Sequence, residues 1–184
     1  MIDYDKSNRS ILLADAVAPH LRAGDSILDV GCGYAAYPKF QGTTLPRLLR
    51  DTLGDIHYHG IDNRTDVIAE CRKTYPEDEW TVTDAGLFVP GKKYDAVFHL
   101  GFDRKDLSDA WKVHGNLLRA GLGPRVVLLE AGSPAGKSSR HLESFREVQA
   151  VYCERGYDVV CSGSYFWTYR VTQPARQWAI LEAA

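Results

Sequence analysis

Short hydrophobic runs of strand type alternate with helix-type segments from one end of the 184-residue chain to the other. This alternation predicts a mostly parallel sheet, because a helix after each strand returns the chain to the starting edge of the sheet. We expect strands at residues 26–30, 57–61, 79–83, 94–100, 125–130, 157–163 and 176–181. The length suits one domain, so the sequence predicts a single α/β domain over residues 1–184, a three-layer sandwich with a seven-stranded sheet.

Helical periodicity fills most of the intervals between these strands. Apolar residues recur at helical spacing at residues 8–18, at 65–74, and in two segments that end at Gly121 and Gly156. A further helix begins late, at residues 44–54, with a proline in its first turn and a glycine at its end. About a dozen residues without helical period join the last two strands, so a hairpin is expected and the final strand should run antiparallel.

The charge balance limits the partners that the chain can attract. Lys and Arg (22) nearly equal Asp and Glu (24), and the formal net charge of −2 provides no positive field for duplex DNA. The apolar runs are shorter than the roughly 20 residues that span a bilayer, and the N-terminal residues MIDYDKSNRS are too polar and acidic for a signal peptide. We therefore expect a cytoplasmic protein with no membrane partner.

The four cysteines show no pairing of metal-binding or redox type. They form no C-x-x-C motif and have no histidine at ligand spacing. We expect reduced thiols and no metal site.

A turn with two glycines follows the first expected strand, in the segment Asp29-Val30-Gly31-Cys32-Gly33. Glycine lets the backbone turn sharply and approach a ligand that a Cβ would keep away. Nicotinamide, flavin and S-adenosylmethionine enzymes all have such a turn, and a plain tight turn would have the same residues. This motif alone does not choose among them.

Two acidic residues narrow the choice. Asp62 ends the second expected strand, where a carboxylate can accept hydrogen bonds from the ribose hydroxyls of an adenosine-containing cofactor. Asp84 ends the third, in a position to accept a hydrogen bond from the adenine amino group. Either residue alone also suits a helix N-cap or a loop. Together they outline an adenosyl pocket, because neighbouring strand ends meet at the carboxyl edge of the sheet.

In these stretches the chain resembles the class I S-adenosylmethionine-dependent methyltransferases, which have a Rossmann-like fold. The matching pieces, in chain order, are ILDVGCGYA, GIDNR, TDAG and YDAVFHLGF. The resemblance implies S-adenosyl-L-methionine as cofactor and methyl transfer as the activity. It also implies cofactor contacts from Asp29, Gly31, Cys32, Gly33, Asp62, Asn63, Asp84, Ala85, and from His99, Leu100 and Gly101 through their backbone.

The chain departs from the usual pattern just after the glycine turn. Asp62 lies 31 positions after Gly31, whereas the dinucleotide-binding pattern places its acidic residue about 20 positions on, so roughly ten residues are extra. These extra residues carry the aromatic side chains Tyr34, Tyr37 and Phe40. We expect either a lid over the methyl donor and its acceptor or a solvent-side loop whose aromatics cover the core.

Transfer of a methyl group from a sulfonium is an in-line displacement, helped by alignment of the acceptor and by removal of its proton. His99, at the tip of the fourth strand, is the first candidate for the base, although a strand-end histidine often only donates a hydrogen bond to the backbone. Asp103 and Glu130 are further candidates by position, and Asp103 also suits a solvated place on the surface.

The residues at the end of the fourth strand bear on the identity of the methyl acceptor. His99-Leu100-Gly101-Phe102 stands where amino-directed nucleic-acid methyltransferases carry an Asn/Asp-Pro-Pro-aromatic run, and the chain has no Pro-Cys pair of the cytosine-C5 type. We also expect no appended domain to hold a macromolecule. We therefore expect a small-molecule acceptor, methylated on oxygen or nitrogen rather than on carbon or sulfur, and no nucleic-acid partner.

Residues 131–138 (AGSPAGKS) fit a relaxed P-loop pattern. Only 46 residues follow Ser138, too few for the strands of a P-loop nucleotide-binding enzyme. The same segment could instead attract an anionic group of the acceptor, through Lys137 and Arg140 at a helix N-terminus. The sequence also stays compatible with a non-catalytic S-adenosylmethionine-binding protein and, less well, with a nicotinamide oxidoreductase.

Overall fold

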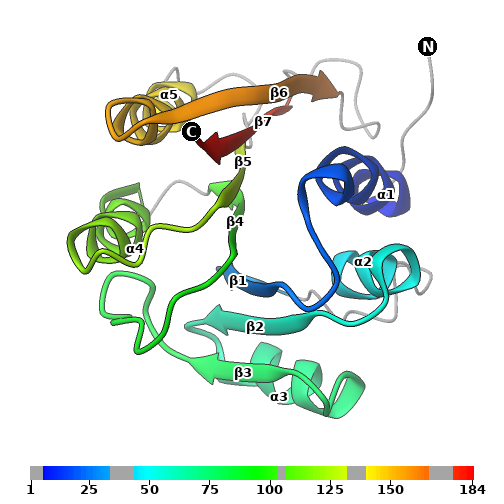
Figure 1. Ribbon diagram of the computed structural model, residues 1–184. Coiled ribbons are helices and arrows are strands. Elements are labelled where there is room, and N and C mark those ends of the chain that lie inside the picture. The colour runs from blue at the N-terminus through cyan, green and yellow to red at the C-terminus, as the bar shows by residue number, and fades with distance from the viewer. Residues whose placement is uncertain (1–5, 34–43, 103–106, 132–139, 166–175) are drawn as a thin grey trace.

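A seven-stranded sheet with strand order β3-β2-β1-β4-β5-β7-β6 forms the centre of the computed structural model, which describes residues 6–33, 44–102, 107–131, 140–165 and 176–184 (Figure 1). All neighbouring pairs from β3 to β5 are parallel, and β7 runs antiparallel to both β5 and β6. The predicted mostly parallel sheet with an antiparallel last strand is therefore confirmed. The strands are β1 (Ser26–Val30), β2 (His57–Asp62), β3 (Glu79–Val82), β4 (Ala96–Phe102), β5 (Val126–Ala131), β6 (Tyr157–Tyr165) and β7 (Arg176–Ala183).

Helices cover both faces of this sheet, which makes the three layers of the Rossmann-like α/β sandwich. In Figure 1, α1 and α2 lie on one side of the sheet and α4 and α5 on the other. Residues of α1, α2 and α3 share one buried apolar cluster with the sheet, whereas α4 and α5 each contribute to a cluster on the opposite face. The helices are α1 (Lys6–Val17), α2 (Leu45–Leu53), α3 (Thr65–Thr74), α4 (Leu107–Arg119) and α5 (Arg140–Cys153), with a short 3-10 helix at Ala18–His20.

The late helix predicted after the glycine turn is α2. Thr44 is extended at its start (φ −97°, ψ 153°), and Pro46 lies in its first turn, where a missing N–H costs no hydrogen bond. Gly54 ends the helix with φ 83°, a left-handed conformation that glycine adopts without a Cβ penalty. Leu49, in the middle of α2, is completely buried. The strand boundaries differ from the predicted ones by at most two residues.

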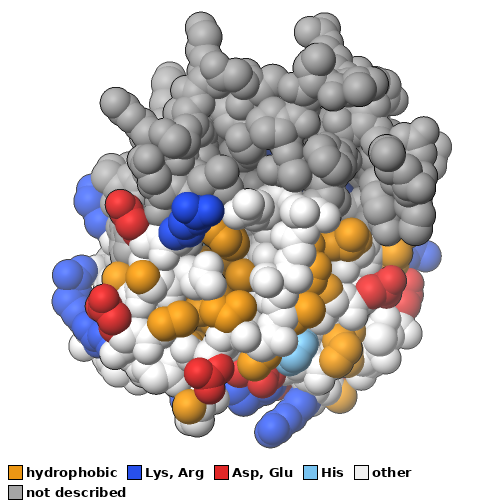
Figure 2. All heavy atoms as spheres, turned by 90° about the horizontal axis from the view of Figure 1, so that it is seen from above, with side chains coloured by type: hydrophobic (Ala, Val, Ile, Leu, Met, Phe, Trp, Pro, Cys, Tyr) orange, Lys and Arg blue, Asp and Glu red, His pale blue; other side chains and the backbone are white. Residues whose placement is uncertain are grey.

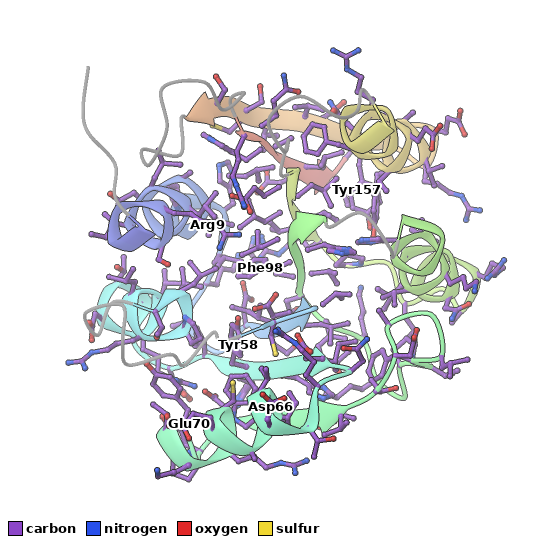
Figure 3. All side chains as sticks on the ribbon, turned by 180° about the vertical axis from the view of Figure 1, so that it is seen from behind. Arg9, Tyr58, Asp66, Glu70, Phe98 and Tyr157 are labelled. Carbon is purple, nitrogen blue, oxygen red and sulfur yellow. The ribbon has the colours of Figure 1, made fainter. Side chains whose placement is uncertain are left out.

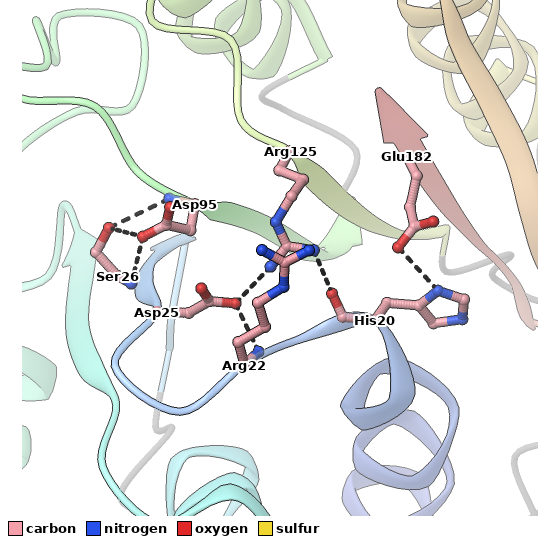
Figure 4. Close-up of polar contacts among 7 residues, drawn as sticks. All are labelled: His20, Arg22, Asp25, Ser26, Asp95, Arg125 and Glu182. Atoms are coloured by element: carbon pink, nitrogen blue, oxygen red, sulfur yellow. Dashed lines mark hydrogen bonds and ion pairs between the residues drawn. The ribbon is translucent and has the colours of Figure 1, made fainter. Parts of the chain in front are cut away.

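A network of charged and polar groups closes the amino ends of the parallel strands (Figure 4). Arg125, just before β5, donates hydrogen bonds to the Asp25 carboxylate (2.6 Å) and to the His20 carbonyl (2.7 Å). Asp95, just before β4, accepts hydrogen bonds from the N–H and hydroxyl groups of Ser26 at 2.9 and 2.8 Å. These contacts join segments that precede three strands, and they lie at the end of the sheet opposite the glycine turn.

Strand β6 forms one edge of the sheet. Val159 and Val160 are partly exposed on it, and a register shift between Val159 and Cys161 interrupts its pairing with β7. Figure 2 views the molecule from above this edge and shows hydrophobic side chains interspersed with acidic and basic ones. In the part of the chain that the structure describes, no helix combines the length and the apolar character needed to cross a membrane.

Candidate functional site

The glycine turn lies at the carboxyl ends of β1 and β2. Gly31 and Gly33 have φ angles of 68° and 52°, in the left-handed region that favours glycine. The Cys32 N–H donates to the Ile61 carbonyl (3.0 Å), and the Gly33 N–H donates to the Asp62 carboxylate (2.9 Å). The turn is therefore held against the end of β2 by its own backbone donors.

Asp29, near the end of β1, is a buried carboxylate with one unused oxygen. Its side chain is on the α1 face, where the Tyr58 hydroxyl donates a short hydrogen bond to Oδ2. Among the described residues, Oδ1 has no hydrogen-bond partner although it is inaccessible to solvent. Burial raises the pKa of Asp29 to about 6, against the opposing effects of Tyr58 and Arg9. An unpartnered buried oxygen is costly, so this atom is suited to accept a hydrogen bond from a ligand.

Asp62 is occupied by protein donors in this structure. Besides Gly33, it accepts hydrogen bonds from the Arg64 N–H and Nε (both 3.0 Å, at Oδ1) and from an Arg64 terminal nitrogen (3.3 Å, at Oδ2). A carboxylate offers about four acceptor positions, and these contacts fill them. A ribose that binds Asp62 through both hydroxyls must therefore displace the Arg64 guanidinium.

The other predicted cofactor residues near Asp62 are in more open positions. Asp84 is half-buried, and its Oδ1 accepts a hydrogen bond from the Gly86 N–H at 2.7 Å. This contact orders the loop after β3 and uses only one of the two carboxylate oxygens. Ala85 packs against the apolar cluster of β1 and α4, and Asn63 is exposed. The structure thus brings Asp62 and Asp84 to neighbouring strand ends, and their cofactor contacts stay predictions.

Cys32 and Cys71 are free cysteines that pack beneath the turn. A hydrogen bond with Cys71, followed by burial, raises the pKa of the Cys32 thiol. The Cys71 thiol donates to the Gly33 carbonyl at 3.6 Å. Gly60 permits this packing, because a Cβ there would lie 2.3 Å from the Trp80 ring and 3.0 Å from the Cys32 sulfur. Both thiols support the turn as small side chains.

His99 lies beside the start of the glycine turn, because it pairs in register with Val30 of β1. Its side chain is 8% exposed and packs on the α4 face, where its Nδ1 lies 3.2 Å from Nε2 of His114. Burial, and then the neighbouring His114, lower the pKa of His99 well below its ordinary value. Leu100 packs on the opposite face, with the cluster of α1 to α3. A role for His99 as a base stays a prediction.

Glu130, the second-rank candidate base on β5, is fully buried between two guanidinium groups. Arg9 of α1 binds both of its oxygens, one through Nε at 2.8 Å, and Arg176 of β7 lies 3.3 Å away. Figure 3 shows Arg9 extending from α1 toward the sheet, on the side where Phe98 and Tyr58 lie. The arrangement holds α1, β5 and β7 together, and a catalytic role for Glu130 stays a prediction.

Several predicted residues cannot be placed in this arrangement. The lid residues Tyr34, Tyr37 and Phe40, the candidate base Asp103 and the anion-binding Lys137 lie outside the described residues, as does most of the P-loop-like segment. Arg140 is the first residue of α5. The lid and the anion-binding loop therefore stay predictions.

The sequence contained signals for three residues of the site that the motifs did not reveal. Arg9 precedes the buried Leu13 and Val17 by four and eight residues, so it lies on the buried face of α1. Tyr58 stands in a buried strand next to the one that carries Asp29, which is where a partner for that carboxylate is expected. His114 directly follows the buried Val113 and thus borders the apolar face of α4.

Comparisons with known proteins show the fold. No protein-family profile and no curated protein sequence matches the chain. The chain is similar to the solved structure of the N-methyltransferase NodS from Bradyrhizobium japonicum with S-adenosyl-L-homocysteine, at TM-score 0.69 and 12% identity over 98% of this chain and 89% of that one. A SAM-dependent methyltransferase from Geobacter sulfurreducens, also with S-adenosyl-L-homocysteine, is similar at TM-score 0.63 and 15% identity, with 100% and 94% covered.

The small RNA methyltransferase HEN1 is similar at TM-score 0.68 and 16% identity, over 100% of this chain and 26% of that one. The fold is thus the Rossmann-like fold of class I methyltransferases. At these identities the likeness concerns the fold, and function rests on the site.

Proposed function

We propose that the chain binds S-adenosyl-L-methionine at the carboxyl ends of β1 and β2 and transfers its methyl group to a small-molecule acceptor. The observation that carries this proposal is the buried Oδ1 of Asp29, which has no partner among the described residues and adjoins the two-glycine turn. The similarity of the fold to methyltransferases with S-adenosyl-L-homocysteine supports the same cofactor.

The residues fit a ligand that carries positive charge and an adenosine. When bound, S-adenosylmethionine supplies a methyl group on a positively charged sulfur. Asp29 would accept a hydrogen bond from a cationic group, which gains more from a buried ionised acceptor than a neutral donor does. Gly31 and Gly33 would allow close approach of the backbone, while Asp62 and Asp84 would accept hydrogen bonds from the ribose and from the adenine amino group.

The sheet topology disfavours a nicotinamide oxidoreductase. Dinucleotide-binding Rossmann domains have the all-parallel strand order 3-2-1-4-5-6. Here the antiparallel β7 lies between β5 and β6. The carboxylate with a raised pKa at the end of β1 also gives no advantage in binding an anionic pyrophosphate, because like charges repel.

The charge of the chain agrees better with a small acceptor, which we propose is methylated on oxygen or nitrogen, than with a polyanion. Lys and Arg do not exceed Asp and Glu, so binding of a polyanion has no general electrostatic support. RNA is still included in the test, because the small RNA methyltransferase HEN1 has a similar fold.

Calorimetric titration tests the cofactor. S-adenosylmethionine and S-adenosylhomocysteine should both bind to the wild-type protein. The Asp29→Asn substitution should lower the affinity for S-adenosylmethionine by tenfold to about 100-fold, as expected for loss of a charge-assisted hydrogen bond. Affinity for S-adenosylmethionine should also fall as the pH drops below about 6, where Asp29 becomes protonated. Binding of a nicotinamide dinucleotide in place of both compounds would refute the proposal.

Radiolabelled methyl transfer to a library of hydroxyl and amine compounds, with RNA as a parallel sample, tests the activity. Incorporation into a small compound supports the proposal, and incorporation into RNA alone contradicts the proposed acceptor. Tight cofactor binding with no transfer to any sample would favour the non-catalytic binding protein.

A further inference from the structure

Three buried side chains form a hydrogen-bonded row on the face of the sheet that α4 and α5 cover. His99 of β4 contacts His114 of α4 (Nδ1 to Nε2, 3.2 Å), and His114 contacts Tyr152 of α5 (Nδ1 to hydroxyl, 2.6 Å). Their exposed fractions are 8%, 1% and 0%. The row begins beside the glycine turn, where His99 pairs with Val30, and ends in the core under α5.

The geometry of each contact is that of a directed hydrogen bond. The rings of His99 and His114 are inclined by only 21° with centroids 5.4 Å apart, so the two facing nitrogens lie between the centroids and the rings meet edge to edge. The Tyr152 ring stands nearly perpendicular to His114, at 83°. Both nitrogens of His114 are therefore used, one toward each neighbour.

The direction of the donors follows from the buried end of the row. Among the described residues, the Tyr152 hydroxyl has a single hydrogen-bond partner, Nδ1 of His114, while the adjacent Tyr157 hydroxyl donates to the Pro124 carbonyl. A buried O–H group must donate, so the Tyr152 proton points to Nδ1 of His114. His114 then carries its proton on Nε2 and donates it to Nδ1 of His99.

The assignment of donors holds because neither histidine is positively charged and Tyr152 is not ionised near neutral pH. Burial lowers the pKa of His114 to about 4, burial and then the neighbouring His114 lower the pKa of His99 well below its ordinary value, and burial raises the pKa of Tyr152. All three groups are therefore neutral near pH 7, and each imidazole carries one proton.

We propose that Tyr152 and His114 are positioning residues that hold His99 as its Nε2–H tautomer, so that His99 acts at the methyl-transfer site as a hydrogen-bond donor and not as a base. The assignment of the tautomer does not depend on the proposed function. The role of His99 in methyl transfer does rest on the proposed function. A histidine whose Nδ1 accepts a hydrogen bond and whose Nε2 carries a proton has no free lone pair with which to take a proton from an acceptor.

Nuclear magnetic resonance of the ligand-free protein tests the tautomer. In protein with ¹⁵N-labelled histidine, long-range proton–nitrogen correlations distinguish protonated from unprotonated ring nitrogens, and His99→Gln and His114→Gln assign the signals among the six histidines. Both His99 and His114 should show a protonated Nε2 and an unprotonated Nδ1 at pH 7. The reverse pattern in His99 would overturn the proposal.

Tyr152→Phe tests whether the Tyr152 hydroxyl sets the direction of the hydrogen bonds in the row. Without the phenol proton, the two tautomers of His114 become closer in energy, and the nitrogen shifts of His114 and His99 should move toward averaged values. Tyr157→Phe is the matched control, because it removes a neighbouring buried hydroxyl outside the row and should leave these shifts unchanged. Unchanged shifts in Tyr152→Phe, or equal changes in both variants, would overturn the role of Tyr152.

Two substitutions of His99 test its function. The side-chain nitrogen of glutamine occupies about the place of Nε2 and that of asparagine about the place of Nδ1, so His99→Gln keeps the proposed donor and His99→Asn does not. His99→Gln should retain at least about tenfold more kcat than His99→Asn, the worth of one neutral hydrogen bond. Equal losses in both variants, with the wild-type tautomer as predicted, would overturn the donor role alone. Failure of the wild-type protein to bind S-adenosylmethionine would instead contradict the proposed function.

Discussion

Replacement of Asp29 by asparagine should stabilise the ligand-free protein, whereas it should weaken the proposed binding of S-adenosylmethionine. The wild-type carboxylate is buried, it accepts one short hydrogen bond from Tyr58, and its Oδ1 has no partner among the described residues. Ionisation of Asp29 therefore destabilises the folded state, and asparagine avoids this cost while its amide oxygen still accepts the bond from Tyr58.

The size of the effect follows from the pKa. Burial raises the pKa of Asp29 from 3.8 to about 6. A group with a raised folded-state pKa contributes stability that is complete below the unfolded value and is lost as the pH rises through the folded value. The difference of about two pKa units corresponds to about 3 kcal/mol at pH 7. The new amide N–H of asparagine is buried without a partner, which costs about 1 kcal/mol, so the expected net gain in stability is about 2 kcal/mol.

Urea unfolding without ligand at pH 7 and at pH 4 measures this gain. At pH 7 the Asp29→Asn variant should gain about 2 kcal/mol, or about 5 °C in Tm for a protein of this length. At pH 4 the gain should disappear, because the wild-type carboxyl is then protonated in the folded state. Asp95→Asn is the control, with an effect of opposite sign. Burial raises the pKa of Asp95, but hydrogen bonds from Ser26 lower it, and the net shift is downward. The Asp95→Asn substitution should therefore destabilise the protein at pH 7. A loss of stability in Asp29→Asn at pH 7, or a gain that does not depend on pH, would refute the reasoning.

Three further substitutions have defined expectations. Gly60→Ala places a Cβ 2.3 Å from an indole ring, and this overlap should cost about 2 kcal/mol or more in the free energy of unfolding. Arg125→Met removes the guanidinium that lies 2.6 Å from the buried Asp25 carboxylate, and the uncompensated charge should cost about 2 kcal/mol in urea unfolding. Arg64→Met frees acceptor positions of Asp62, so calorimetry should show severalfold tighter binding of S-adenosylmethionine.

Each of these expectations has an outcome that contradicts it. For Arg125, the comparison is Arg47→Met, whose ion pair with Asp51 is long (3.9 Å) and exposed and should contribute almost nothing. An equal loss in both variants would show that burial of the ion pair does not matter. An unchanged Tm in Gly60→Ala would disprove the close packing of β2 against the indole ring. Weaker cofactor binding in Arg64→Met would show that Arg64 contacts the ligand and does not compete with it.

The order of the elements and the kind of sheet could be predicted from local patterns in the sequence. Alternating strand-type runs and helical periods, together with the short connection before the last strand, predicted a parallel sheet that ends antiparallel. The glycine turn was predictable for the same reason, because the left-handed φ angles of Gly31 and Gly33 depend on the residue type itself. Asp62 was predictable as a neighbour of this turn, since strand ends meet at one edge of the sheet.

Only the tertiary structure determined which groups contact each candidate residue. Glu130 looked like a possible base at a strand end, but Arg9, 121 residues away in the sequence, binds it through packing of α1 against the sheet. His99 looked like a candidate base at a strand tip, but it is buried against His114 of α4, which in turn contacts Tyr152 of α5. Local residue pattern determines backbone conformation, whereas the protonation and hydrogen bonding of a buried group depend on what the fold packs against it. The sequence therefore located the turn at Gly31 and Gly33, and the structure determined which groups contact Asp29 and His99 beside it.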